Sequence, residues 1–531
     1  MIDILIIGGG GAGLSCAIEA KKNCENVVVL SKTYPTSSQT SQAQGGINAV
    51  ISPIDSIENY INDTLKSAHN IGDESTIKYM CDNSNNTIKW LDSIGVPFSR
   101  DEHNNIAQRK LGGASYPRAC YSSDYTGLKI IHTLYDKCIK DDIKFLDEYM
   151  LLSLILEDNE IKGITALDIK NSEVKQILAK KVILATGGYA GIYSNHTTNS
   201  TATTGDGIAV ALKAGITLAN MEYVQFHPTA LKYNSILISE SARGEGGYLV
   251  TKDGKRFVDE LLPRDIVARA IYSKIENDQE IFLDLRHLSK EHILKTMPQE
   301  YELVLQFTGL KLDEDLVPIT PAAHYSMGGI KTSKDGKTNI KNLYAIGETS
   351  CNGVHGANRL GGNSLLEIIT FGRLAAKDAT CSMYNSTKDT TTKEYDSYTK
   401  DKKMVENLFN LPNKIDFYTE KERLSSILFK NVGLFRDEEN LSQALREIEN
   451  MLENIPNMGL GDKSRIYNTN LKEFIEFQNM LHIAKAIVVS ALYREESRGA
   501  HYRVDFQEEN MKYEKETLIR YIDNDLVLES I

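Results

Sequence analysis

The chain has 531 residues, of which 41% are hydrophobic and 25% are charged, and its net charge is −12. This length exceeds a single small core, so we expect about two to four globular domains. The acidic balance without a basic stripe argues against nucleic acid as a partner, and the absence of an apolar run of about 18 residues argues against a transmembrane helix.

The chain opens with a nucleotide-binding pattern. Residues 2–7 (IDILII) predict a buried strand, residues 14–22 predict a helix, and residues 27–30 (VVVL) predict a second strand. This βαβ unit of about thirty residues has the size of a nucleotide-binding half. Because the N-terminus enters a strand at once and lacks a basic leader with a cleavage site, we expect a cytoplasmic protein, which could still dock onto a membrane-bound partner.

Three glycines between the first strand and the helix carry the cofactor prediction. Gly8, Gly10 and Gly13 form GxGxxG, which lets the backbone approach a pyrophosphate at the positive end of a helix. The motif alone is weak evidence, but its place between a strand and a helix favours a nucleotide. Ser31 and Lys32 stand where a typical NAD site has an acidic residue at the end of the second strand.

Two further strands predict one sheet that is interrupted by an insertion. Residues 181–186 (KVILAT) and 343–346 (LYAI) are buried-strand patterns that each run into glycine. We place the insertion between them, at about 223–330. The loops ATGG (185–188) and TGDG (204–207) would singly be plain turns, but behind GxGxxG they are what a two-dinucleotide fold for FAD needs.

The sequence changes in character after about residue 383. Residues 384–403 are polar, rich in Thr and Lys and free of glycine, which predicts a linker or a solvated helix start, and we place the linker at 384–405. Apolar residues at three- and four-residue spacing, as in 474–492, then predict a helical domain at 406–500. Residues 501–531 form a C-terminal segment.

These patterns predict an α/β fold. We expect an FAD-binding domain of the Rossmann-like, two-dinucleotide-binding type at residues 1–222 and 331–383. An inserted α+β capping domain at 223–330 would bind the substrate, and a C-terminal helical domain would follow. The seven cysteines are scattered and form no CxxC pair, so we expect reduced thiols and neither a zinc site nor an iron–sulfur cluster in this chain.

A cluster of cations and hydrogen-bond donors flanks the predicted insertion. A single histidine is more often structural than catalytic, and a single arginine more often forms a salt bridge. Two arginines and two histidines beside Gly or Pro in loop-like segments change this balance, because forked guanidiniums bind carboxylates through paired hydrogen bonds. The cluster suits a small dicarboxylate. Its members are His227, Ser239, Glu240, Arg243, Glu245, Arg264, Asp265, His324, His355, Asn358, Arg359, Asn363 and Ser364.

At these motifs the chain resembles the succinate dehydrogenase/fumarate reductase flavoprotein subunit family, whose superfamily includes L-aspartate oxidase. The resemblance covers residues 2 to about 506. The motifs that carry it, in chain order, are SQAQGG, FHPT, RGEGG, PRDIVARAI, HYSMGG, HGANRLGGNSLLE and ESRGAHYR.

The resemblance implies an enzyme that interconverts fumarate and succinate by hydride transfer between flavin N5 and a carbon of fumarate. His227, Ser239 and His324 would hold one end of the substrate, and Arg359 would clamp a carboxylate. The family usually has Thr at the position of Ser239, and either hydroxyl can donate the bond. The bound cations would draw charge into the carboxylate and stabilise the carbanion-like transition state.

The resemblance also implies a proton donor. Arg264 falls where the family places the group that protonates the substrate carbon. Because an arginine side chain hardly ever loses its proton, a neighbouring acid such as Glu240 or Asp265 would have to relay the proton.

The stretch YPTSSQTSQAQGG (34–46) resembles the loop along the isoalloxazine ring. In many respiratory members a histidine at the position of Gln39 is bonded covalently to the flavin, whereas glutamine has no such nucleophilic nitrogen. We therefore expect non-covalent FAD with a lower potential, which favours fumarate reduction; for two electrons about 30 mV corresponds to about 1.4 kcal/mol. The implied cofactor contacts are Gly8, Gly10, Gly13, Ser31, Lys32, Ser38, Gln39, Thr40, Gln44, Gly45, Gly46, Ala185, Thr186, Gly187, Asp206, Glu348, Asn363, Ser364 and Leu365.

Two other functions compete with this interpretation. L-aspartate oxidase binds FAD without a covalent link and carries a glutamate before a Gly-Gly pair, where it reads the amino group of its substrate. Here Leu111 precedes Gly112 and Gly113, and a leucine cannot pair with an ammonium. A flavoprotein that has lost its chemistry is the other alternative, but the arginines and histidines of the cluster are all present.

The resemblance implies partners as well. Respiratory members pass electrons to a separate iron–sulfur subunit, from which the electrons reach a membrane anchor, and this would place the chain on the inner face of the cytoplasmic membrane. The sequence alone does not identify the electron donor.

Overall fold

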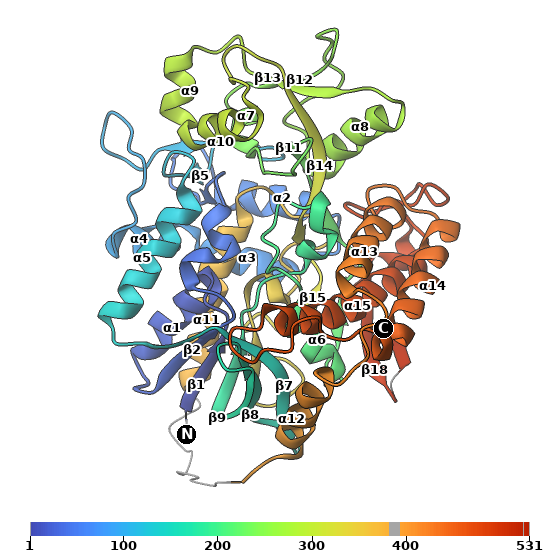
Figure 1. The fold of residues 1–531 in the computed structure, drawn as a ribbon. Helices are drawn as coiled ribbons and strands as arrows, with labels where there is room; N and C mark the ends of the chain where they lie inside the picture. The colour runs from blue at the N-terminus through green and yellow to red at the C-terminus, as the bar shows by residue number, and fades with distance from the viewer. Residues whose placement is uncertain (1, 382–392, 524, 530–531) are drawn as a thin grey trace.

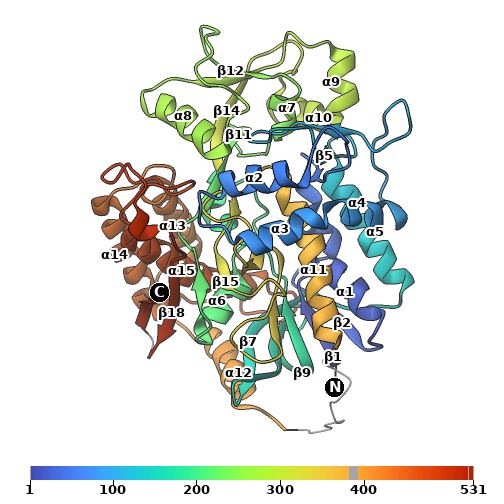
Figure 2. The same ribbon diagram turned by 180° about the vertical axis from the view of Figure 1, so that it is seen from behind.

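The structure is a computed structural model that describes residues 2–381, 393–523 and 525–529. Figure 1 shows three parts, and Figure 2 shows them from behind. The largest part surrounds the main sheet, a second part lies above it in the picture, and a helical part lies along one side. β1 runs from the N-terminus at the bottom of Figure 1 toward the second part.

In the described residues, seven strands form the main sheet, and its centre is parallel. β1 pairs in parallel with β2 and β9, and β9 also pairs in parallel with β16. A meander of β7, β8 and β9 makes the other half antiparallel. The strands are β1 (Ile2–Ile7), β2 (Val27–Ser31), β6 (Lys144–Asp147), β7 (Tyr149–Glu157), β8 (Glu160–Asp168), β9 (Glu173–Leu184) and β16 (Leu343–Ala345), in the order β6-β2-β1-β9-β8-β7 with β16 on β9.

Helices cover both faces of this sheet. Ile4 and Ile6 of β1 belong to a core that includes α1 (Gly11–Lys21), α5 (Thr126–Lys140) and α11 (Asn363–Cys381). Leu5 and Ile7 belong to the core on the opposite face, with α6 (Asp206–Lys213) and α15 (Thr469–Tyr493). Burial on both faces explains why the parallel strands are continuously apolar rather than alternating.

The second part is a four-stranded sheet with its own helices and its own apolar core. All its elements lie between residues 224 and 326, and the boundaries of 223–330 stay a prediction. They are β11 (Val224–Leu231), β12 (Tyr248–Thr251), β13 (Ile281–Asp284), β14 (Val317–Ser326), α7 (Glu240–Gly244), α8 (Arg264–Glu276), α9 (Lys290–Thr296) and α10 (Pro298–Thr308).

The helical part begins earlier than the sequence indicates. Of the expected linker at 384–405, residues 384–392 lie outside the described residues, and α12 (Asp396–Leu408) occupies its last ten residues. The helix forms because Val405 and Leu408 pack into the core beside the meander, while the buried Asp401 accepts a hydrogen bond from Ser153 at 3.1 Å. α13 (Phe417–Asn431) and α14 (Glu438–Asn454) precede α15.

The remaining elements are short or peripheral, and among the described helices none is long and apolar enough to cross a membrane. They are α2 (Ile57–Ser67), α3 (Glu74–Asp82), α4 (Ser84–Ser93), β3 (Ile47–Asn48), β4 (Gln108–Arg109), β5 (Ala119–Cys120), β10 (Leu218–Ala219), β15 (Gly329–Lys331), β17 (Ser350–Cys351), β18 (Leu518–Ile522) and β19 (Asp525–Glu529).

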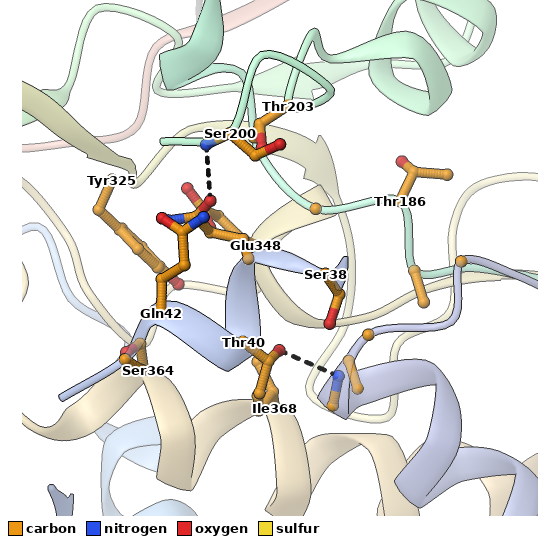
Figure 3. Close-up of a pocket in the computed structure, with 18 of the residues that line it drawn as sticks. Ser38, Thr40, Gln42, Thr186, Ser200, Thr203, Tyr325, Glu348, Ser364 and Ile368 are labelled. Carbon is orange, nitrogen blue, oxygen red and sulfur yellow. Dashed lines mark hydrogen bonds between the residues drawn. The ribbon is translucent and has the colours of Figure 1, made fainter. Parts of the chain in front are cut away.

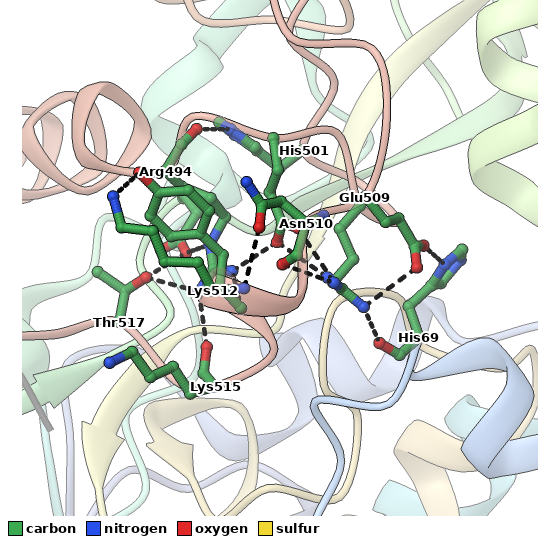
Figure 4. Close-up of polar contacts among 12 residues, drawn as sticks. His69, Arg494, His501, Glu509, Asn510, Lys512, Lys515 and Thr517 are labelled. Carbon is green, nitrogen blue, oxygen red and sulfur yellow. Dashed lines mark hydrogen bonds and ion pairs between the residues drawn. The ribbon is translucent and has the colours of Figure 1, made fainter.

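Arg494 fastens the C-terminal segment to the rest of the protein (Figure 4). Its buried guanidinium donates to Glu222 at 2.6 Å and to Glu496 at 2.8 Å. It also donates to the carbonyls of Tyr513 and Lys515, at 2.6 and 2.8 Å. These contacts hold the C-terminal segment in one position, because moving it would leave the buried charges of Arg494 and its glutamates unpaired.

Candidate active site

An open cavity of about 1650 Å³ lies where the parallel strands end. Ile7, Leu30, Ala185 and Ile346, at or just beyond the ends of β1, β2, β9 and β16, line it together with residues of the second part. The carboxyl ends of strands are where open α/β sheets bind ligands.

The glycines of GxGxxG divide into two roles. Gly8 has φ +117°, and a Cβ there would lie 2.0 Å from the Ala185 carbonyl oxygen. Gly10 borders the cavity and caps α1, whose first turn holds no acidic residue. Gly13 does not line the cavity; a Cβ there would lie 1.9 Å from the Gly8 carbonyl oxygen, so it allows close packing of helix and strand. The cradle fits a pyrophosphate at the helix N-terminus.

The loop at 34–46 runs along the same cavity (Figure 3). Thr40 Oγ1 accepts the Gly11 N–H at 3.1 Å, and Gln39 Oε1 accepts the Ser200 N–H at 2.9 Å. The buried Ser38 Oγ has no hydrogen-bond partner among the described residues, which suits a polar atom that meets a ligand.

Lys32 lines the cavity, but other protein groups hold its charge. Its ammonium lies 2.6 Å from Asp206 Oδ2 and 2.6 Å from Glu476 Oε1, and it donates to the Thr204 hydroxyl at 3.1 Å. Although burial alone would raise the pKa of Asp206, Lys32 holds it below its usual value. Lys32 and its two carboxylate partners, Asp206 and Glu476, therefore link β2, α6 and α15 beside the cavity.

Asn363 is the predicted cofactor residue that turns away from the cavity. Its Oδ1 accepts from the Tyr60 hydroxyl at 2.7 Å and from Asn48 at 2.8 Å, and its amide donates to Thr64 at 3.2 Å. These buried hydrogen bonds connect the start of α11 to α2. They use the polar atoms of the Asn363 side chain, which therefore does not contact a cofactor in the cavity.

Two neutral histidines face each other in the second part of the site. The rings of His227 and His324 line the cavity with their centres 4.9 Å apart. Burial, followed by the nearby Arg264, lowers the pKa of both well below the usual value. Nδ1 of His324 lies 2.7 Å from the Thr198 hydroxyl, and when that hydroxyl donates, the Nε2–H of His324 is left as a donor. Nδ1 of His227 lies 3.0 Å from the Thr229 carbonyl oxygen and 3.2 Å from the Thr229 nitrogen, so Nε2 of His227 is a donor in the tautomer in which Nδ1 accepts from the Thr229 N–H.

Gln225 brings the two guanidiniums together, and the sequence patterns do not single it out. Its Oε1 accepts from Arg264 at 3.1 Å and from Arg359 at 3.1 Å, while its amide donates to Asn358 at 2.8 Å. Arg359 also lies over the ring of Tyr325, 4.2 Å from its centre. Burial and then Arg264 lower the pKa of Arg359 to about 10.

Glu240 is the acid that contacts Arg264. Its Oε2 accepts from Arg264 Nε at 2.9 Å and Nη2 at 2.6 Å. Although burial would raise the pKa of Glu240, Arg264 and Arg243 hold it below the usual value. Asp265 instead pairs with Arg269 at 2.8 Å, so of the two acids suggested by the sequence Glu240 is the one placed to exchange a proton with Arg264.

The cavity collects most of the predicted site residues. Those that do not line it are Gly13, Arg243, Glu245, Asp265, His355, Asn358 and Asn363. Leu111 lies buried on its wall, and Gly112 donates its N–H to Glu240 at 2.7 Å. Tyr325, Ser200 and Gln42 also line it without having been predicted. Of the predicted residues, those that line it are Gly8, Gly10, Ser31, Lys32, Ser38, Gln39, Thr40, Gln44, Gly45, Gly46, Leu111, Ala185, Thr186, Gly187, Asp206, His227, Ser239, Glu240, Arg264, His324, Glu348, Arg359, Ser364 and Leu365.

Comparison with known proteins identifies the family. A family model described as "FAD binding domain" matches residues 3–365, and one described as "Fumarate reductase flavoprotein C-term" matches residues 421–529. The chain is 36% identical to the succinate dehydrogenase flavoprotein subunit of Rickettsia conorii, over 96% of this chain and 91% of that protein. The chain belongs to the succinate dehydrogenase/fumarate reductase flavoprotein subunit family.

Further relatives of this flavoprotein are similar over nearly their whole length. The 8-methylmenaquinol:fumarate reductase flavoprotein subunit of Wolinella succinogenes is 37% identical, over 95% of this chain and 86% of that protein. One subunit of the fumarate reductase (CoM/CoB) of Methanothermobacter marburgensis is 36% identical, over 97% and 96%. A solved quinol fumarate reductase chain of E. coli has TM-score 0.93 and 32% identity, over 99% and 96%.

These findings confirm the predicted fold class, and they confirm that this flavoprotein is an FAD-dependent oxidoreductase. The glycine cradle, the N-terminus of α1 beside the cavity and the unpartnered Ser38 hydroxyl fit the FAD that the family binds.

Proposed function

We propose that this flavoprotein interconverts fumarate and succinate, that it favours fumarate reduction, and that its FAD is held without a covalent bond. The observation that carries the proposal is the convergence of Arg264, Arg359, His227, His324 and Ser239 on one cavity that also contains the FAD cradle. Two guanidiniums and three neutral donors match the two carboxylates of a small diacid.

Different residues would bind the two carboxylates of the substrate. Arg359 keeps its charge at neutral pH and pairs with one carboxylate of the substrate, while the Nε2–H groups of His227 and His324 and the Ser239 hydroxyl hold the other end. Because these donors are fixed by Gln225, Thr198 and other protein groups, they stabilise developing negative charge without reorganising. Bound FAD would supply or accept the hydride.

Proton transfer would pass through Arg264. In fumarate reduction Arg264 would give a proton to the substrate carbon. Glu240, an ionised carboxylate, would then take up a proton that comes from solvent and pass it to Arg264 through the contacts at 2.6 and 2.9 Å. The lowered pKa of Glu240 keeps the pair in its charged form, with the proton on the arginine, before the reaction.

Gln39 supports the non-covalent link. It lines the cavity at the loop where many respiratory members carry a histidine that bonds to the flavin, and its amide contacts Ser200 instead. We propose that the lower flavin potential expected without such a bond favours fumarate reduction.

Partners are proposed from the relatives. Because the cysteine pattern of this chain offers no cluster, a separate iron–sulfur subunit would carry electrons, and through it the protein would sit at the inner face of the cytoplasmic membrane. The relatives from Wolinella and Methanothermobacter are named for different electron donors, a methylmenaquinol and CoM/CoB. No observation favours L-aspartate oxidase, and Leu111 offers no acidic partner to an ammonium.

One preparation tests the proposal. Acid precipitation of the pure protein should leave the yellow flavin in solution, whereas colour in the pellet would contradict non-covalent binding. The same protein should oxidise a reduced dye with fumarate faster than it reduces an oxidised dye with succinate. Turnover of L-aspartate with oxygen, without turnover of fumarate, would overturn the assignment.

A further inference from the structure

We propose that Glu300 is a positioning residue that sets the direction of a hydroxyl chain ending at Ser239, and so makes the binding of the dicarboxylate weaken at alkaline pH. This inference rests on the proposed function, since it takes the ligand of Ser239 to be the substrate carboxylate. Glu300 lies in the first turn of α10, outside the cavity, and no sequence motif contains it.

The chain of contacts runs from α10 through α7 to the cavity. Glu300 Oε1 accepts the Ser239 N–H at 2.9 Å and lies 3.2 Å from the Ser241 hydroxyl. The Ser241 hydroxyl lies 2.8 Å from Ser239 Oγ, which also accepts the Ser241 N–H at 3.1 Å. Glu300 and Ser241 are fully buried, whereas Ser239 borders the cavity. The Ser241 hydroxyl therefore chooses between two acceptors.

The charge of Glu300 decides that choice. While Glu300 is neutral, the Ser241 hydroxyl donates to the nearer Ser239 Oγ, both acceptor positions of Ser239 are filled, and the Ser239 O–H is left to donate into the cavity. When Glu300 is ionised it is the stronger acceptor, and the Ser241 hydroxyl turns to it. In the empty site Ser239 then donates to Ser241, so it must give up that hydrogen bond before it can donate to the substrate carboxylate.

The surroundings of Glu300 place its titration near neutral pH. Burial, followed by the charge of Asp124, raises the pKa of Glu300 to about 8, while Arg109 opposes the shift. Burial also raises the pKa of Asp124 to about 6. Among the described residues, Glu300 Oε2, Asp124 Oδ1 and Arg109 Nη1 have no hydrogen-bond partner.

Other charges near this group are engaged elsewhere. The guanidinium of Arg109 lies over the ring of Tyr121, and Glu245 also interacts with its charge. Glu245 in turn pairs with His292 at 3.0 Å. On α7, the carboxylate of Glu240 faces Arg264. Since Asp124 is already ionised above about pH 6, Glu300 is the acid of this pair that changes its charge between neutral and alkaline pH. Glu348 on the cavity wall, whose pKa burial raises to about 7, also ionises in this interval, but its contribution is the same in the natural chain and in variants at Glu300 and Ser241.

Calorimetry of fumarate binding to the oxidised, FAD-loaded protein tests the inference without turnover. Between about pH 7 and about pH 9 the Kd of the natural chain should rise about tenfold, the loss expected for one hydrogen bond to a charged group. Glu300→Gln, which stays neutral, should lose this tenfold rise in Kd. Ser241→Ala should also abolish the step, because it removes the hydroxyl that turns.

The matched control is Glu302→Gln, the same change at an exposed position of α10, which should keep the step. Two outcomes would overturn the inference. In one, the tenfold rise in Kd persists in both Glu300→Gln and Ser241→Ala. In the other, the natural chain binds fumarate with the same Kd at both pH values. If the natural chain does not bind fumarate even at about pH 7, the proposed function fails instead. Ser241→Ala keeps the test usable if Glu300→Gln does not fold.

Discussion

Gln225 shows how one uncharged side chain can organise a charged site. Arg264 and Arg359 would repel each other, and the lowered pKa of Arg359 reflects that proximity as well as burial. The Gln225 carbonyl oxygen lies between them and accepts from both. Asn358 and the Arg359 carbonyl hold the amide on its other side, which fixes the orientation.

Replacing this amide should weaken substrate binding. Gln225→Leu removes the shared acceptor, so the guanidiniums separate, and we expect the KM for fumarate to rise about tenfold with bound FAD unchanged. Steady-state assays and the flavin absorbance measure both. Gln108→Leu is the control, since Gln108 donates to the Ala49 and Arg118 carbonyls outside the cavity. An unchanged KM in Gln225→Leu would show that Arg359 needs no such support.

Arg264 should matter for turnover more than for binding. Arg264→Lys keeps a positive charge but loses the fork that meets Glu240 twice, so we expect kcat to fall about a thousandfold, within the range for general acids. Arg269→Lys makes the same change on the same helix, where the side chain pairs with Asp265, and should leave kcat within about threefold. Equal losses in the two variants would argue against Arg264 as the proton donor.

The sequence predicted the residues of the site that lie in motifs and not those that support them. His227, Arg264 and Arg359 stand in distinctive loops. Gln225 lies two residues before His227, yet a lone glutamine in a strand carries no signal of its own. Glu300 acts on Ser239 from 61 residues away along the chain, and only the packing of α10 against α7 brings them together.

At the scale of elements, Lys32 joins three segments that are distant in the sequence. It follows β2, and its carboxylate partners begin α6 and lie within α15. The sequence marked Lys32 as a departure from an NAD site, but the charged partner on α15 could not be foreseen. The predicted βαβ unit, by contrast, follows from local apolar runs, whereas α12 is polar and forms through its contacts with the meander.

Removing this charge should destabilise the protein. Lys32→Met leaves Asp206 and Glu476 as buried carboxylates without their shared cation, and breaking such a pair costs about 3 kcal/mol or more. Thermal unfolding should show a clear drop in Tm. Lys472→Met is the control: Lys472 pairs with Glu476 at 3.2 Å, and its loss leaves Glu476 paired with Lys32, so it should cost about 1 kcal/mol or less. A smaller drop for Lys32→Met than for the control would contradict this account.

For the whole molecule, buried acids should make stability fall as the pH rises through neutral. Burial raises the pKa of Glu348 to about 7, and burial with Asp124 raises that of Glu300 to about 8. The folded protein therefore keeps protons that the unfolded chain has already lost above about pH 4.5, and unfolding releases them. Buried histidines oppose this trend up to about pH 7.5, because the unfolded chain still carries part of its histidine protons up to about one unit above their ordinary pKa.

Between about pH 6.5 and about pH 8 the Tm of the natural chain should accordingly decrease relative to that of the double variant with Glu300→Gln and Glu348→Gln. The difference should be equivalent to about 2 kcal/mol, since each pH unit of unequal protonation is worth about 1.4 kcal/mol per group, and each single variant should show part of it. Glu302→Gln, exposed on α10, should behave as the natural chain does. An equal pH dependence of Tm in the natural chain and the double variant would mean that neither buried acid holds its proton at neutral pH, and with it the charge-dependent switch at Ser239 would lose its basis.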